Sequence, residues 1–206
     1  MVSAGSSSCA LVPAPKPIPL PRLIGWRSDV ASYTHPVNAE PFLAEVVRHL
    51  ERLRFEVVLI GNAAAALQGA PVTTVDFDFM FRKTRVNLRK LKDLATALRA
   101  TVLRPYYPVS DLFRVVRDED GLQLDFMATI HGVRSLAGLR DRATVVWFGK
   151  APLAVASLPD IIRSKKAAGR PRDLAVIDLL EKTHEEATRA SGDAERAAPR
   201  KRPRPS

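Results

Sequence analysis

Two aspartates separated by a single residue, Asp76 and Asp78, stand in an aromatic run that continues through Phe81. In a β-strand the side chains alternate between faces, so both carboxylates project to one side while Phe77 and Phe79 point into the protein. Neighbouring carboxylates on an apolar strand repel each other unless a cation joins them. The pair therefore predicts a divalent-metal site.

A third carboxylate, Asp125, occurs in a second strand-like run in which Leu124 and Phe126 face the opposite way. If this strand lies beside the first, three carboxylates converge. Such a cluster can hold two metal ions, which activate an attacking hydroxyl and stabilise the leaving phosphate of an in-line displacement. The spacing of acidic residues thus favours phosphoryl-group chemistry.

The dipeptide Gly61-Asn62 stands between a strand-like run and an alanine run. At such a junction the free backbone amides and the helix dipole suit phosphate oxygens, and glycine lets the backbone approach closely. A short turn separates this loop from the aspartates. Phosphates held at Gly61 and Asn62 are therefore expected to share a metal with Asp76 and Asp78.

A basic residue continues the apolar stripe of a helix near the C-terminal end of the chain. Leu158, Ile161, Ile162 and Lys165 follow the spacing i, i+3, i+4, i+7, which places them on one helical face. Lys166 falls beside this stripe. Lys165 is therefore the better candidate to face the reacting groups.

Four stretches in this order resemble the nucleotidyltransferases of the DNA polymerase beta superfamily. The sequence looks most similar to the bacterial branch that includes abortive-infection toxins of type IV toxin-antitoxin pairs. The stretches are residues 61–69, residues 71–78, Asp125 and residues 165–173. A lone Asp-x-Asp motif would be weak support, whereas the ordered set is much more specific.

The resemblance implies a site and a reaction. Asp76, Asp78 and Asp125 would be catalytic and would bind two Mg²⁺ ions, or Mn²⁺. A nucleoside triphosphate would be held by Gly61, Asn62, Lys165 and Arg170. Its nucleoside monophosphate would pass to an acceptor hydroxyl, on tRNA or another RNA, and a cognate antitoxin would be a partner. The residues leave open which nucleotide is used, and also whether the acceptor is RNA, protein or a small molecule.

Two departures from the family pattern support an alternative. Asn62 stands where similar proteins usually have Gly or Ser, although Asn tolerates the conformations that such a loop needs. Val176 stands where many relatives carry a second acidic residue. The alternative is a catalytically inactive nucleotide- or RNA-binding module of the same fold.

Simpler interpretations accompany each motif. The aspartate pair could be the solvated face of an edge strand, and Asp125 could simply be exposed. The basic residues after Lys165 could stabilise the end of a helix. Tyr106 and Tyr107 could stack on a base, although packing within a loop is the interpretation that we favour for a tyrosine pair beside proline.

The elements around these motifs predict an α+β fold of the nucleotidyltransferase type: a small mixed β-sheet flanked by helices, with a helical C-terminal segment. The Asp118-Glu119-Asp120-Gly121 turn predicts a hairpin. We expect helices from Glu40, over 63–66, 87–98 and 157–169 and from Pro171, and strands over 55–60, 75–81, 112–116, 122–127 and 144–148.

Composition sets the outer limits. The chain has 206 residues, 46% of them hydrophobic, with one cysteine and a net charge of +10. We expect a disordered Pro/Ser-rich leader over 1–38, a nucleotidyltransferase-fold domain over 39–188 and a disordered basic tail over 189–206. A solvated tail and a phosphate-binding tail are equally compatible with its charge. The lone Cys9 argues against a disulfide framework, and no run of residues is apolar enough for a bilayer, so we expect a cytoplasmic protein without membrane contacts.

Overall fold

The computed structural model describes residues 39–74 and 76–197. The predicted leader and the last nine residues of the predicted tail lie outside the described residues. The helices and strands, in chain order, are α1 (Ala39–Arg52), β1 (Val57–Ile60), α2 (Gly61–Ala66), β2 (Phe77–Phe81), α3 (Arg85–Ala97), β3 (Thr101–Leu103), β4 (Phe113–Arg117), β5 (Leu122–Met127), α4 (Leu136–Asp141), β6 (Thr144–Phe148), β7 (Ala151–Val155), α5 (Leu158–Ala168), α6 (Pro171–Leu174) and α7 (Ile177–Ala197).

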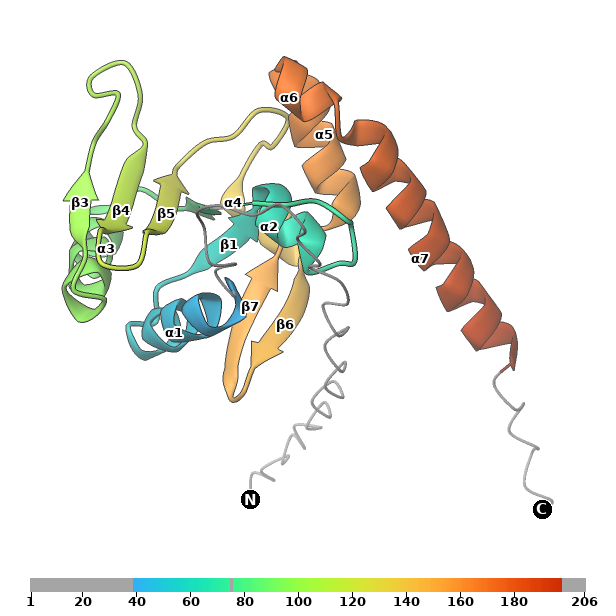
Figure 1. Cartoon of the computed structure of the whole chain (residues 1–206), viewed down its shortest axis with the longest axis horizontal. Helices are drawn as coiled ribbons and strands as arrows, with labels where there is room; N and C mark the ends of the chain where they lie inside the picture. The colour runs from blue at the N-terminus through green and yellow to red at the C-terminus, as the bar shows by residue number, and fades with distance from the viewer. Residues whose placement is uncertain (1–38, 75, 198–206) are drawn as a thin grey trace, which may run out of the picture.

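A single seven-stranded sheet has the strand order β3-β4-β5-β2-β1-β7-β6. The pairs β2/β5 and β1/β7 are parallel, whereas the remaining neighbours are antiparallel. Helices surround the sheet, and α5, α6 and α7 follow its last strand (Figure 1). The predicted α+β architecture, a mixed sheet with a helical C-terminal segment, is confirmed.

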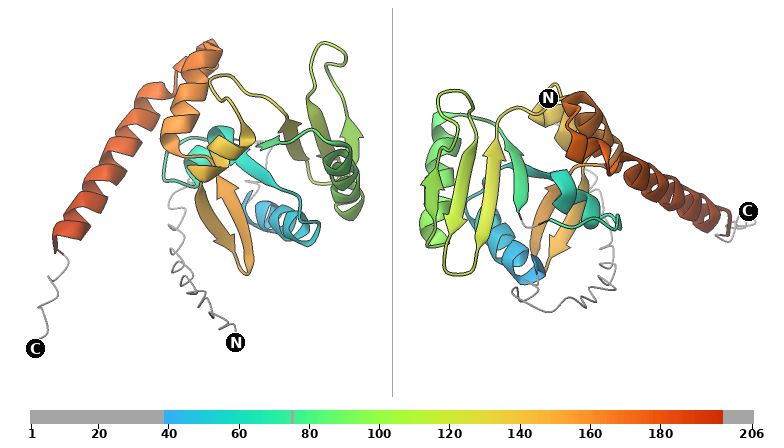
Figure 2. Two further views of the ribbon diagram at one scale, coloured as in Figure 1. Left: turned by 180° about the vertical axis from the view of Figure 1, so that it is seen from behind. Right: turned by 45° about the horizontal axis from the view of Figure 1, so that its top comes forward.

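The core forms on the sheet face that α1 and α3 cover (Figure 2). Phe79 and Phe126 on neighbouring strands stack with ring centroids 5.1 Å apart, and Phe55 and Phe81 pack edge to face at 5.9 Å. Phe79, Phe81 and Phe126 are fully buried. Because side chains alternate along a strand, burying these rings directs Asp78 and Asp125 to the opposite face.

On that opposite face, one row of residues crosses five strands. Leu103 on β3 pairs with Arg114 on β4, and Arg114 pairs with Asp125 on β5. Asp125 in turn pairs with Asp78 on β2, and Asp78 pairs with Ile60, the last residue of β1. The register therefore brings charged residues from three separate strands side by side.

The structure adds three elements that the sequence patterns did not predict. β3 has only three residues, and α4 is a short helix of six. β7 contains Pro152, which argues against a strand within a sheet. Its ladder with β1 covers Ala154 and Val155 only, so the missing amide of Pro152 lies outside that ladder.

The C-terminal helix extends beyond the predicted domain boundary. α7 continues to Ala197, so the boundary placed at residue 188 falls inside this helix. α7 packs on α5 through its first turns and then projects away from the sheet (Figure 1). Within the described residues, no helix combines the length and the apolar character that a bilayer span requires.

Candidate active site

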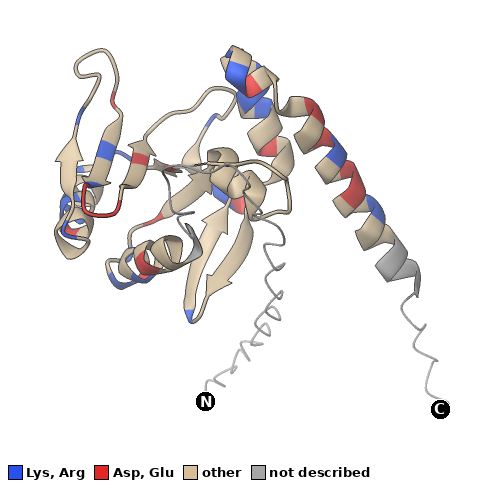
Figure 3. Cartoon of the chain, viewed as in Figure 1, with Lys and Arg blue, Asp and Glu red and all other residues tan. Residues whose placement is uncertain are grey.

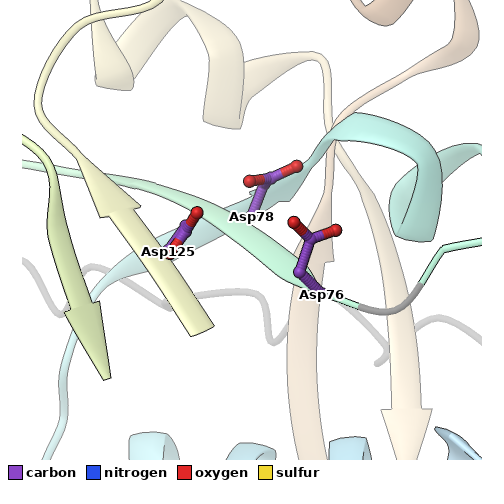
Figure 4. A group of neighbouring side chains, drawn as sticks. All are labelled: Asp76, Asp78 and Asp125. Carbon is purple, nitrogen blue, oxygen red and sulfur yellow. The ribbon is translucent and has the colours of Figure 1, made fainter. Parts of the chain in front are cut away.

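Three carboxylates meet on the open face of the sheet. Asp78 lies within β2, Asp76 immediately precedes that strand, and Asp125 lies on the neighbouring β5. One oxygen from each carboxylate lies within 4.8 Å of the other two, and Figure 4 shows all three side chains on the same side of the two strands. β2 lies between β5 and β1, so the solvated edge strand considered above is excluded.

The cluster raises the pKa of Asp78 to about 7. Burial of this carboxyl is the largest cause, followed by the charges of Asp76 and Asp125, whereas Lys165 and Arg172 lower the pKa. A carboxyl group in such a position either keeps a proton near neutral pH or needs a cation beside it. Carboxylate oxygens are the ligands that Mg²⁺ and Mn²⁺ prefer, so the donor set fits a hard divalent cation.

Neighbouring polar groups orient Asp76. The Thr74 hydroxyl donates to Asp76 Oδ1 at 2.9 Å, and Gln123 Nε2 on β5 donates to Asp76 Oδ2 at 3.4 Å. These two donors hold the carboxylate on the side of Asp78. Asp76, the first of the two paired aspartates predicted to bind metal, is thus positioned by both its own loop and the neighbouring strand.

Asp125 is bound by an arginine that the sequence interpretation did not include. Arg114 donates from Nε to Asp125 Oδ1 at 2.8 Å and from Nη2 to Oδ2 at 2.7 Å. These hydrogen bonds are the main reason that the pKa of Arg114 is raised, and the charges of Asp125 and Asp76 add to them. Each carboxylate oxygen keeps one further lone pair. A metal at Asp125 would therefore share this carboxylate with a guanidinium group.

We expect Arg114→Met to make the stability of the protein depend more strongly on divalent cations than that of the wild type. The substitution leaves the buried Asp125 carboxylate unpaired, which should lower the free energy of unfolding by about 3 kcal/mol, the lower end of the range for a broken buried pair. A bound cation would restore much of that loss. Thermal melts at pH 8 with and without MgCl₂ measure the effect. Arg48→Met, at an exposed position of α1, is the control, and an equal response of both variants to Mg²⁺ would contradict the expectation.

Gly61 starts α2 directly after β1, beside Asp78. Its φ is +70°, and a Cβ at this position would overlap the Asp78 carboxylate. Glycine is therefore required both for the backbone conformation and for the space it leaves. Asn62 follows, donating from Nδ2 to the Thr73 carbonyl at 3.4 Å, while its Oδ1 is buried without a hydrogen-bond partner among the described residues.

The basic residues after β7 lie on the Gly61 side of the cluster. Lys165 is buried and donates to Asp173 at 2.9 Å, and its charge is close enough to lower the pKa of Asp78. Lys166 is exposed and pairs with Glu181 instead. Arg170 is exposed at the start of α6, and the charge of its neighbour Arg172 acts on Asp78. Arg172 belongs to the basic motif of residues 165–173, whereas Arg114 is a candidate that the site predicted from sequence did not include.

Comparisons with known proteins identify the fold. No protein-family profile matches the sequence, and no curated protein matches it significantly. The solution structure of the antibiotic-resistance factor ANT(2″)-Ia is 14% identical, with a TM-score of 0.51, over 79% of this chain and 97% of that one. The chain has the nucleotidyltransferase fold.

Two further nucleotidyltransferase-fold structures are similar. The crystal structure of ANT(2″)-Ia in complex with adenylyl-2″-tobramycin is 15% identical, with a TM-score of 0.49, over 78% of this chain and 100% of that one. An antigenic nucleotidyltransferase-like protein from Paracoccidioides brasiliensis is 15% identical, with a TM-score of 0.46, over 70% of this chain and 76% of that one. The resemblance of this nucleotidyltransferase-fold chain to abortive-infection toxins stays a prediction.

Proposed function

We propose that the protein is a metal-dependent nucleotidyltransferase, which transfers a nucleoside monophosphate from a nucleoside triphosphate to an acceptor hydroxyl and releases pyrophosphate. The observation that carries the proposal is the convergence of Asp76, Asp78 and Asp125 within 4.8 Å. Burial and mutual repulsion make this arrangement unfavourable without a cation. The nucleotidyltransferase fold supports the same reaction class, although fold alone does not determine function.

The residues around the three carboxylates form a phosphate side and an acceptor side. Asp76 and Asp78 would hold Mg²⁺ or Mn²⁺, with Asp125 completing the site, and the cation would neutralise charge on the reacting phosphate. Gly61 leaves room for the Asp78 carboxylate, and the backbone amides at the start of α2 would contact the phosphates. Lys165 supplies positive charge where the pyrophosphate departs, and Arg170 and Asn62 lie on the same side. Asp125 faces the acceptor hydroxyl.

A second candidate function is supported by the Arg114–Asp125 pair. A guanidinium that already satisfies both oxygens of Asp125 at 2.7 and 2.8 Å competes with a metal for this carboxylate. That arrangement favours a module that binds nucleotide or RNA without turnover. In either case the role as a toxin with a cognate antitoxin, and the cytoplasmic location, remain proposals from the sequence.

A transfer assay with the four α-³²P-labelled triphosphates separates the two candidates. We expect the protein with Mg²⁺ or Mn²⁺ to label a cellular RNA or protein fraction, and we expect EDTA or Asp76→Ala to abolish labelling because both remove the cation. Asp93→Ala, at an exposed position of α3, is the control. Undiminished labelling by Asp76→Ala would contradict the proposal. Nucleotide binding by calorimetry without any labelling would favour the second candidate.

A further inference from the structure

The loop between β3 and β4, residues 104–112, presents uncovered aromatic side chains. Tyr106 is 58% exposed and Tyr107 is 62% exposed. The interpretation favoured from sequence, packing of both rings within the loop, is wrong for Tyr106. Among the described residues, no cationic group stacks on the Tyr106 ring and no other aromatic ring packs against it. One flat aromatic surface is therefore open to a ligand.

The rest of the loop holds this surface in place. The Arg104 guanidinium lies 3.7 Å from the centroid of the Tyr107 ring and 5.1 Å from that of Phe113, the first residue of β4. The Ser110 amide donates to the Tyr106 carbonyl at 2.7 Å, and Asp111 pairs with Lys83 at 2.6 Å. Tyr107 thus anchors the loop to the sheet through Arg104, which leaves Tyr106 as the free ring.

The loop lies on the side of the carboxylates away from the phosphate-side residues. Leu103, the residue before the loop, pairs with Arg114, and Arg114 pairs with Asp125. Adjacent strands are about 4.8 Å apart, so β3 is roughly 10 Å from β5. Gly61 begins the helix after β1, on the other side of β2. Figures 1 and 2 agree that the loop and α6 rise at the same end of the sheet, on either side of β5 and β2.

The charged and aromatic groups near the β3–β4 loop indicate which class of acceptor the protein binds. Arg114, which is paired with Asp125, lies within the row of carboxylates, and Arg104, which lies 3.5 Å from Asp111, is at the start of the loop. Figure 3 shows the basic residue on β4 beside the acidic residue on β5. Arginines beside an exposed aromatic ring suit a ligand that combines phosphates with planar bases.

We propose that Tyr106 is a stacking platform for a base at the single-stranded end of an RNA acceptor, and that Arg104 and Arg114 contact the phosphates of that strand. The proposal deepens the function proposed above and rests on it. It assigns the β3–β4 loop to acceptor selection. Single-stranded RNA is recognised in this way, by unstacked bases on aromatic side chains.

Fluorescence anisotropy with a labelled single-stranded RNA dodecamer in EDTA tests the contact separately from catalysis. We expect Tyr106→Ala to weaken RNA binding on the order of tenfold, because it removes one base–aromatic stack, and Tyr106→Phe to bind like the wild type. Tyr106→Leu keeps an apolar side chain without an aromatic face and should bind as weakly as Tyr106→Ala. Trp147→Ala is the control, since Trp147 is an exposed aromatic (39%) on β6, at the opposite edge of the sheet.

A transfer assay then distinguishes failure of this proposal from failure of the proposed function. With Mg²⁺ and labelled triphosphate, we expect Tyr106→Ala to raise KM for RNA on the order of tenfold while KM for the triphosphate stays unchanged. Absence of metal-dependent transfer by the wild type would remove the proposed function. Transfer with unchanged RNA affinity in Tyr106→Ala, or transfer only to protein or to a polycationic small molecule, would overturn the stacking platform alone.

Discussion

Asp78→Asn is expected to abolish nucleotidyl transfer and, at the same time, to stabilise the metal-free protein above pH 7. The loss of transfer follows from removing a ligand of the cation, whose electrostatic contribution of several kcal/mol corresponds to about three powers of ten in rate. The gain in stability follows from the pKa of about 7 for Asp78 in the folded protein, against 3.8 for an unperturbed aspartate. Transfer assays and thermal melts of one purified variant measure both effects.

The sign of the pH dependence is fixed by the direction of the Asp78 pKa shift. A carboxyl whose folded-state pKa is raised stabilises the fold fully only below its unfolded pKa, near 4, and this contribution is lost as the pH rises through about 7. The loss is at most about 4 kcal/mol, from 1.36 kcal/mol per unit of pKa. The neutral asparagine does not undergo this loss, so the two proteins should differ at pH 8 and converge at pH 4.

Magnesium should reverse the difference between wild type and Asp78→Asn. The cation stabilises ionised Asp78 in the wild type, whereas the variant lacks that ligand. MgCl₂ at pH 8 should therefore raise the melting temperature of the wild type but not that of Asp78→Asn. Asp93→Asn on the exposed face of α3 is the matched control. Equal melting temperatures of the wild type and Asp78→Asn from pH 4 to pH 8 would show that the cluster is not under electrostatic strain.

Gly61→Ala should also lower the transfer rate strongly, because one methyl group meets the metal-binding carboxylate. A residue other than glycine at φ +70° is strained by about 1–2 kcal/mol. The added Cβ would also displace the Asp78 side chain. A misplacement of about 1 Å in a catalytic group lowers the rate about 100-fold, so we expect a transfer rate reduced to that extent, together with weaker binding of Mg²⁺ in calorimetry.

A control for Gly61→Ala distinguishes backbone strain from steric overlap with the Asp78 carboxylate. Gly149, between β6 and β7, has a similar φ of +64°, and a Cβ there would meet nothing within 4 Å. Gly149→Ala should therefore lower the melting temperature through backbone strain alone and leave transfer intact. If both variants lost activity equally, the position of Gly61 beside Asp78 would have no special role.

Much of the site follows from local rules that sequence alone expresses. Extended backbone through β2 and the residue before it is sufficient to place Asp76 and Asp78 together, and the buried rings of Phe79 and Phe126 fix which face they take. The helical spacing that selected Lys165 over Lys166 is likewise confirmed by the burial of Lys165. These positions depend only on the period of one element.

The Arg114–Asp125 pair was not predicted, although the sequence of the hairpin contains the information that locates it. The turn over 118–121 makes Arg117 and Leu122 the first pair of the hairpin, and counting back three residues on each strand places Arg114 opposite Asp125. The hydrophobic pattern predicts a first strand that ends at Val116, and by itself it does not give the pairing of residues across the hairpin. A one-residue error in register would turn these side chains to the other face, so this inference needed the turn as well as the strands.

Other features depend on loop conformation and on packing between distant segments. The charge of Arg172 on α6 acts on Asp78, although α6 begins only after Gly169 has ended α5, far from β2 in the chain. Tyr106 is exposed, while Arg104 stacks on the ring of the neighbouring Tyr107. No periodic pattern in the sequence contains either arrangement, since the first joins elements that are far apart in the chain and the second depends on the conformation of the β3–β4 loop.

Anomalous diffraction from crystals grown with Mn²⁺ and a non-hydrolysable triphosphate tests the central claim most directly. We expect an anomalous peak at metal–ligand distance from oxygens of Asp76 and Asp78, on the side that Asp125 faces, with the triphosphate between the metal and Lys165. The peak should be absent from Asp76→Ala crystals. A wild-type structure with the triphosphate bound elsewhere and no manganese at these carboxylates would contradict the assignment.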